Sequence, residues 1–192
     1  MDQTQDGQLV LQLQCGDLEA LGSLYDRHRQ MVYRTALAIT NDPEVASDLL
    51  QDVFLRMHRF AHRIDPQRPL KPWLYRMTVN LAYSWIKRRN RWIRCLNEMA
   101  EWLSRERGPT PDKLAERDED WQLIQRAVGN LPVTQRVVVV LYYVGDMSLQ
   151  EISEILDVPV GTVKSRLYYG RRSLKKQLGM HRELLPDVRG AL

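Results

Sequence analysis

The side chains with the clearest chemical meaning are six Lys and Arg residues between Thr162 and Leu178, a stretch without Asp or Glu. At about 100° per residue, one arc of this segment is polar and cationic and the other is apolar. The polar arc contains Lys164, Ser165, Tyr168, Tyr169, Arg172, Lys175 and Lys176. The apolar arc contains Val163, Leu167, Gly170, Leu174 and Leu178. Such a helix suits the DNA major groove, because its back packs on the protein while its front reaches bases and phosphates.

The residues before this helix predict how it is positioned. Ser148 and Glu151 have the spacing of a capping box at the start of a preceding helix. In the turn at residues 157–161, Pro159 forbids continued helix, and Gly161 is expected to supply unusual backbone angles. The second helix would then begin at Thr162, which predicts a helix-turn-helix. The first helix would bury Leu149, Ile152, Ile155 and Leu156, and Arg166 and Arg171 would lie at the edges of the basic arc. The alternative is an amphipathic surface helix with a solvated basic face.

A second basic segment, from Pro72 to about Arg94, interleaves cations with aromatic and amide side chains. One side gathers Leu74, Thr78, Leu81, Ala82, Trp85 and Ile86. The other gathers Trp73, Arg76, Asn80, Tyr83, Ser84, Lys87 and Arg91. Bases stack on aromatic rings for roughly 1–3 kcal/mol each while cations hold the phosphates, so this face suits single-stranded or opened DNA. The alternative is that Trp73 and Tyr83 cover a neighbouring helix and the basic residues are merely solvated.

Charge is segregated along the 192 residues, whose net charge is +4. Residues 1–54 carry three Lys/Arg and nine Asp/Glu, whereas residues 55–94 carry eleven and one. Residues 164–192 are basic again, with eight Lys/Arg and two Asp/Glu. Two separate basic blocks beside acidic segments suggest two nucleic-acid contacts.

The sequence contains no pattern typical of a catalytic site or a metal site. Cys15 and Cys95 lack metal or redox spacing, and the four histidines are scattered. Free thiols in a reducing cytoplasm are expected, with no metal, cofactor or catalytic residue. No apolar run approaches 18 residues and no signal-peptide pattern opens the chain. An enzyme acting on nucleic acid is disfavoured because the second basic face carries no carboxylate.

Helix start and stop signals predict an all-α chain. Asp17 caps a helix that ends at Asn41-Asp42-Pro43, and Pro43 opens another that runs to about Ala61. The segment His62–Lys71 contains two prolines and is expected to be a loop. Before the helix-turn-helix, further helices are expected at Trp121–Asn130 and Thr134–Val144. There the run Val137–Val140 favours a strand by propensity, but its neighbours favour a helix.

The polar stretch Asn97–Asp120 indicates a domain boundary, because loops of this length are uncommon inside a domain. We expect a first helical domain at residues 1–94 and a flexible linker at 95–119. A helix-turn-helix domain would follow at 120–179, with a tail at 180–192.

Four segments in order resemble bacterial RNA polymerase sigma factors of the extracytoplasmic-function group, which have two conserved domains. These are Gly16–Ala20, Asp48–Leu55, Pro72–Asn80 and Leu131–Leu178. The resemblance implies an all-helical factor, itself not an enzyme, that brings core polymerase to −35/−10 promoters, often in a stress response.

The resemblance assigns roles to individual residues. Residues implied to bind the clamp helices of the largest polymerase subunit are Asp48, Gln51, Asp52, Phe54 and Leu55. Residues implied to meet the −10 element are Ile64, Asp65, Lys71, Trp73, Arg76, Asn80, Tyr83, Ser84, Lys87 and Arg91. Residues implied to meet the −35 element are Thr162, Lys164, Ser165, Arg166, Tyr168, Tyr169, Arg171, Arg172 and Lys175.

The same resemblance implies further partners: the flap of the second-largest subunit and an anti-sigma protein, often membrane-anchored, that holds the cytoplasmic factor inactive. The leading alternative is a free-standing helix-turn-helix regulator that binds operators as a dimer. That alternative explains residues 148–178 but gives no task to the basic aromatic face after Pro72 or to the acidic cluster at residues 48–52.

Overall fold

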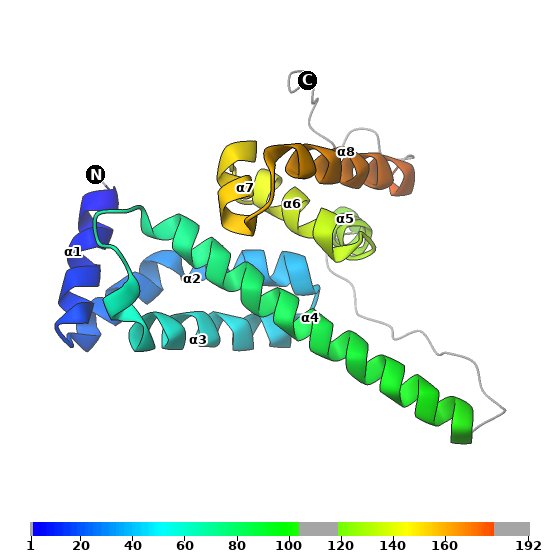
Figure 1. Cartoon of the computed structure of the whole chain (residues 1–192), viewed down its shortest axis with the longest axis horizontal. Coiled ribbons are helices and arrows are strands. Elements are labelled where there is room, and N and C mark those ends of the chain that lie inside the picture. The colour runs from blue at the N-terminus through cyan, green and yellow to red at the C-terminus, as the bar shows by residue number, and fades with distance from the viewer. Residues whose placement is uncertain (1, 104–118, 179–192) are drawn as a thin grey trace.

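The computed structural model describes residues 2–103 and 119–178, and all regular secondary structure among them is helical (Figure 1). The N-terminal half contains α1 (Asp2–Gln14), α2 (Leu18–Thr40), α3 (Pro43–Arg59), the 3-10 helix η1 (Ala61–Arg63) and α4 (Leu70–Leu103). The C-terminal half contains α5 (Glu119–Gly129), α6 (Val133–Tyr143), α7 (Leu149–Leu156) and α8 (Val160–Gln177). The predicted all-α architecture with two helical domains is confirmed. The predicted tail at 180–192 and most of the linker lie outside the described residues.

The ends of α2 and α3 are set by capping side chains at the predicted positions. The Asp17 carboxylate accepts a hydrogen bond from the Glu19 amide at 2.8 Å. Between the two helices, Asn41 closes α2 in the left-handed conformation, with φ 57°. Asp42 then caps α3, and Pro43 occupies its first turn, where a missing amide proton costs nothing. These caps orient α3 against α2.

The core of the N-terminal half lies between α2, α3 and α4. Leu24, Ile39, Met57 and Leu74 are among its fully buried side chains. α4 contributes through its predicted apolar side, of which Leu74, Thr78, Leu81 and Ala82 are buried. Packing of this side fixes which face of α4 is left for contact with other molecules.

In the C-terminal half, burial overrides strand propensity at Val137–Val140. All four valines lie in helix α6 and are at most 4% exposed. They provide the apolar surface on which α7 and α8 pack. The prediction of a helix here is confirmed.

The helix-turn-helix is confirmed, but its turn differs from the expectation. Ser148 and Glu151 form the predicted capping box, with the Ser148 amide donating to Glu151 Oε2 at 2.8 Å. The residue with unusual backbone angles is Asp157, with φ 53°, and not Gly161. Gly161 lies inside α8, which begins at Val160 immediately after Pro159. An Asp can adopt the left-handed conformation and end α7, so the turn does not need the glycine.

Three further boundaries differ from expectation. The helix α1 was not predicted, because its apolar and polar residues show little helical periodicity. α4 begins at Leu70 and continues to Leu103, through residues expected to be linker. The loop expected at His62–Lys71 is therefore shorter and contains η1.

The two halves pack against each other. α6 and α5 lie against α2, and α7 lies against α4 (Figure 1). The side chain of Asn41, at the end of α2, would be 3.3 Å from a Cβ added to Gly129, so the backbone of α5 approaches closely.

Candidate nucleic-acid interface

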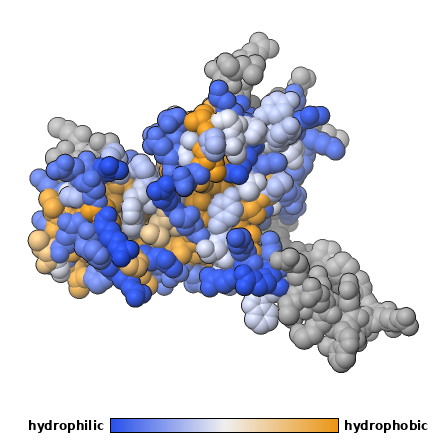
Figure 2. Space-filling view, viewed as in Figure 1, coloured by the Kyte–Doolittle hydropathy of each residue, from blue (hydrophilic) through white to orange (hydrophobic). Residues whose placement is uncertain are grey.

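The basic face of α8 is open to solvent. The apolar arc is buried as predicted, from Val163 to Leu178. A Cβ on Gly170 would lie 2.8 Å from Val139 Cγ2, so this glycine lets α8 sit close to α6. The exposed residues of the opposite arc are Lys164, Ser165, Tyr168, Tyr169, Arg172, Lys175 and Lys176. On the face drawn in Figure 2, hydrophilic surface alternates with hydrophobic areas.

Two tyrosines form an aromatic step within this basic face. Tyr168 and Tyr169 are 59% and 55% exposed, and their rings meet edge to face with centroids 5.4 Å apart. Exposed aromatic rings beside cations are suited to thymine methyl groups or sugar and base edges. Thr162 and Arg166 are half-buried at the margin of the face.

Arg171 has a structural partner that the sequence did not indicate. Its Nε donates to the Tyr143 hydroxyl at 2.8 Å. Its guanidinium also lies over the rings of Tyr142 and Tyr143, at 5.6 and 5.7 Å from the centroids. Arg171 thus holds α8 on α6, whereas Arg172 and Lys175 project from the exposed arc.

The basic face of α4 is only partly open. Arg76, Asn80, Ser84, Lys87 and Arg91 are exposed. Trp73 and Tyr83 are half-buried and pack against the core, so the covering role considered for them is present in part.

A cleft lies between this face and the helix-turn-helix. It has a volume of about 390 Å³ and is lined by Val79, Asn80, Tyr83, Ser84, Lys87, Leu156 and Arg166. Burial raises the pKa of Tyr83 above its ordinary value, and the nearby Arg166 opposes this shift. The volume is near the lower end of the ~300–1,000 Å³ typical of small-molecule pockets. The helix-turn-helix thus limits the space beside this part of the α4 face while the halves are in contact.

Two arginines tie the halves together through backbone carbonyls. Arg76 on α4 donates to the carbonyls of Glu154 and Ile155 at 2.7 and 3.2 Å, at the end of α7. Arg136 on α6 donates to the Ile39 carbonyl at 2.6 Å. Arg136 also donates to the carbonyls of Gly129 and Leu131. Sequence reasoning missed Arg136, although a lone cation in an apolar helix is a usable signal.

The loop between α3 and α4 presents one of its two expected contact residues. Asp65 is exposed, and its Oδ1 accepts from the Gln67 amide at 3.0 Å, which shapes a tight turn. Ile64 is only 5% exposed. Its side chain anchors the loop in the core and does not face a DNA strand. Lys71, at the start of α4, is exposed.

The acidic patch on α3 consists of Asp48, Gln51, Asp52 and Leu55, all exposed on one side of the helix. Leu55 is 64% exposed, which is unusual for a large apolar side chain and typical of a contact surface. Phe54 is 5% exposed and stacks edge-on with Tyr25 at 5.0 Å. This placement corrects the expectation for Phe54, whose side chain supports the patch from inside.

Within residues 2–103 and 119–178, no group of three or more His, Cys, Asp or Glu side chains could hold a metal ion. No helix of the described chain is long and apolar enough to cross a membrane. The site consists of three surfaces: the α8 face, the α4 face with its loop, and the acidic α3 patch.

Comparison with protein families gives two matches. Residues 24–92 match Sigma-70 region 2, and residues 121–174 match Sigma-70, region 4. The chain is 32% identical over 176 residues to ECF RNA polymerase sigma factor SigW of Bacillus subtilis, covering 88% of this chain and 94% of that protein. It is 30% identical over 179 residues to ECF RNA polymerase sigma factor SigM of Mycobacterium tuberculosis H37Rv, and the match covers 91% of this chain and 85% of that protein.

Two solved structures share the fold. CnrH, in complex with the cytosolic domain of CnrY, gives a TM-score of 0.66 at 24% identity and covers 92% of this chain and 98% of that one. The sigma factor RpoE of Bartonella quintana, in complex with the anti-sigma factor NepR, gives a TM-score of 0.63 at 22% identity. The match covers 80% of this chain and 93% of that one.

Proposed function

The chain belongs to the extracytoplasmic-function sigma factors of bacterial RNA polymerase, and on that premise we propose how its three surfaces divide promoter recognition. The observation that carries the proposal is the presence of two basic helix faces, on α8 and on α4, in separate helical domains. A free-standing regulator has use for one such face.

The α8 face reads the −35 element as duplex DNA. Lys164, Ser165 and Tyr168 lie near the start of the helix, where recognition helices contact base edges. The exposed cations further along the helix, Arg172 and Lys175, contact phosphates. Thr162, Arg166 and Tyr169 flank these contacts, and Arg171 keeps the helix in place.

The α4 face and the preceding loop take the −10 element as an opened strand. Trp73 and Tyr83 offer ring surfaces, Asn80 and Ser84 offer hydrogen bonds, and cations on the same face hold phosphates. Asp65 at the loop turn faces a base pulled from the stack. The cations of this surface are Lys71, Arg76, Lys87 and Arg91.

The α3 patch binds core polymerase. Asp48, Asp52 and Gln51 present carboxylates and an amide to a basic partner surface, and exposed Leu55 adds apolar contact. The clamp helices of the largest subunit are the proposed partner there. The flap of the second-largest subunit is the proposed partner of the C-terminal domain.

Promoter engagement requires the halves to separate. Arg76 and the Tyr83 side of the cleft face the helix-turn-helix, so both helix faces reach DNA together only when α7 leaves α4. Binding of polymerase to the α3 patch and to the C-terminal half supplies the free energy for this change.

The remaining assignments follow from the family. The domains proposed from the sequence are 1–94 and 120–179, with 95–119 between them, and the continuation of α4 to Leu103 lengthens the first of them. The protein acts in the cytoplasm without catalytic chemistry of its own. Because two solved relatives of the fold are complexed with CnrY and NepR, an anti-sigma protein is the proposed inhibitor.

Transcription from purified core polymerase with a library of −35/−10 promoters tests the proposal. The expected result is transcription that depends on the chain and on both elements. The variant Asp52→Arg should lose core binding while retaining −35 duplex binding, because α3 lies on the opposite half from α8. Operator-like DNA binding without any core binding would favour the dimeric regulator.

A further inference from the structure

Helix α1 lies outside the matched region, which begins at residue 24, yet it contacts the loop proposed to take a base of the −10 element. α1 packs on η1, the first part of that loop. The contacts are made by one side of the helix, and they involve the loop backbone.

Gln14, at the end of α1, makes the polar contacts. Its Nε2 donates to the Ile64 carbonyl at 2.8 Å and to the Ala61 carbonyl at 3.0 Å. The Ala61 carbonyl also accepts from the Ile64 amide at 2.9 Å, which closes η1. A single amide side chain therefore joins both ends of the short turn that leads into the loop.

Gly7 makes the second contact. A Cβ added there would lie 2.4 Å from the Pro66 carbonyl oxygen, which leaves no space for any other residue without movement of the loop. Gly7 and Gln14 are seven residues apart and share one face of a 3.6-residue helix. Val10 lies between them on that face and is 1% exposed.

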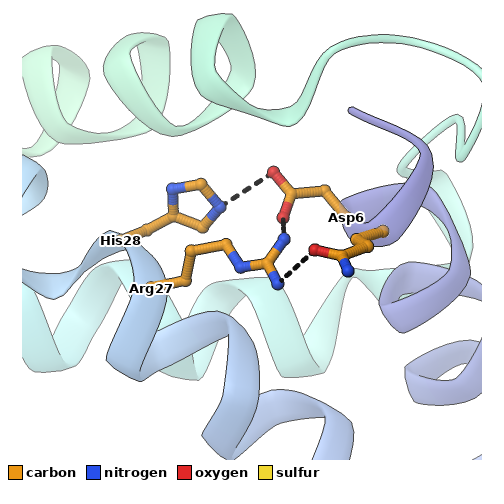
Figure 3. A network of polar contacts seen from close by, with 4 residues as sticks. Asp6, Arg27 and His28 are labelled. Carbon is orange, nitrogen blue, oxygen red and sulfur yellow. Dashed lines mark hydrogen bonds and ion pairs between the residues drawn. The ribbon is translucent and has the colours of Figure 1, made fainter. Parts of the chain in front are cut away.

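α1 is itself anchored to the body of the domain. The Asp6 carboxylate pairs with His28 at 2.9 Å and with Arg27 at 2.9 Å, and Arg27 also donates to Gln5 at 3.0 Å (Figure 3). Asp6 and His28 are 4% and 2% exposed. α1 is therefore a fixed support for the loop and not a freely moving extension.

The loop depends on this support because the interactions within its tip are local and do not attach the tip to the domain. Ile64 is buried, and the turn at the loop tip is closed within residues 65–68. There the Asp65 side chain accepts from the Gln67 amide and pairs with Arg68 at 3.3 Å, and the Asp65 carbonyl accepts from the Arg68 amide at 3.2 Å. Asp65 and Arg68 are exposed, so that pair contributes little in water. The orientation of the tip therefore depends on the backbone of residues 61–66, which α1 contacts.

We infer that Gln14 is a positioning residue for −10 recognition: through the carbonyls of Ala61 and Ile64, it sets where the loop tip meets the DNA base. This inference rests on the proposed function of the loop. The side-chain amide of Gln14 is engaged by these two carbonyls, so its effect is expected on discrimination between bases at one −10 position.

The test compares Gln14→Glu with Gln14→Lys in holoenzyme on promoters randomised at −10, with a constant −35 element. Glu is isosteric but cannot donate to the carbonyls, whereas Lys can. Gln14→Glu should reduce discrimination at one −10 position about five-fold, and Gln14→Lys should recover part of it. The −35 preference and core affinity should remain at the wild-type level.

The matched control is Gln8→Glu, which makes the same charge change at another exposed position of α1, one for which the described chain shows no hydrogen bond to the loop. It should leave the −10 preference intact. An unchanged profile in Gln14→Glu, or an equal fall in activity on every promoter, overturns the inference. Wild-type holoenzyme without any −10 preference would overturn the proposed function of the loop and this inference with it.

Discussion

The basic helices α4 and α8 share a composition and differ in their surroundings. Both carry an apolar back, several cations and exposed or half-exposed aromatic residues. The α8 face is turned to solvent, whereas the α4 face forms one wall of a cleft whose other wall is Leu156 and Arg166. Similar residue patterns therefore give one surface that is open to solvent and one that the helix-turn-helix partly covers.

The two halves also differ in how their cores are made. All buried polar or charged side chains found in residues 5–92 and 123–178 are in the N-terminal half: Asp6, His28, Thr35, Thr40 and Thr78. The C-terminal core is apolar. The N-terminal core therefore includes a buried polar pair, Asp6 with His28, whereas the fully buried side chains of the C-terminal half are apolar.

Arg136 provides the largest expected effect, because it serves both halves. Arg136→Ala leaves the carbonyls of Ile39, Gly129 and Leu131 without this donor. The free energy of unfolding should fall by roughly 3 kcal/mol, measured by urea denaturation. Arg136→Lys should recover only part, since an ammonium group lacks the planar fork. If Arg136→Ala lowers the free energy of unfolding no more than Thr134→Ala at the exposed neighbouring position, Arg136 does not hold the halves together.

Lys164 and Lys175 separate base contact from phosphate contact on the open face. Lys164→Ala should cost about 2 kcal/mol on −35 DNA and little on scrambled DNA, if it meets a base edge. Lys175→Ala should weaken both DNAs alike and lower the slope of log affinity against log salt by about one. Fluorescence anisotropy titrations over a salt series measure both quantities. Equal losses on both DNAs for Lys164→Ala would make it a phosphate contact.

His28 gives the smallest predicted effect and should distinguish the polar core from the apolar one. Burial lowers the pKa of His28 below 6.5, and the Asp6 carboxylate opposes this shift, while Lys71 and Arg27 add to it. The folded state therefore favours neutral His28, whereas the unfolded chain takes up a proton below about pH 6.5. The contribution of neutral His28 to the free energy of unfolding should be fully present above about pH 6.5 and should be lost as the pH falls below that value.

Urea unfolding at several pH values, with His28→Gln as the variant and exposed His58→Gln as the control, measures this dependence. His28→Gln should flatten it, and His58→Gln should not. Identical pH profiles for wild type and His28→Gln would place the acid sensitivity elsewhere.

Local signals in the sequence predicted much of the fold. The capping residues Asp17 and Ser148, the stop at Asn41 and the apolar arc of α8 each act within a few residues of chain, so they could be recognised. The exposed cations of α8 followed from the same periodicity.

The parts that failed depend on contacts between distant residues. α1 is stabilised by Asp6 with His28 and by burial of Val10 and Leu13, not by its own pattern. Ile64 was expected to meet DNA from its position in a motif, but tertiary packing buries it, and it also buries Phe54 beneath the α3 patch. The association of the halves through Arg76 and Arg136 uses backbone carbonyls as acceptors, so the sequence can show the unusual cation at Arg136 but not the groups that it binds.

The central claim is that contact between the halves restricts the α4 face and leaves the α8 face free. The most direct measurement is the affinity of the full chain, alone and bound to core polymerase, for a single-stranded −10 oligonucleotide and for −35 duplex. The free chain should bind the −35 duplex, and its affinity for the −10 strand should rise at least about ten-fold with polymerase, as for a binding state populated below one-tenth. Equal −10 strand affinity with and without polymerase would contradict the account.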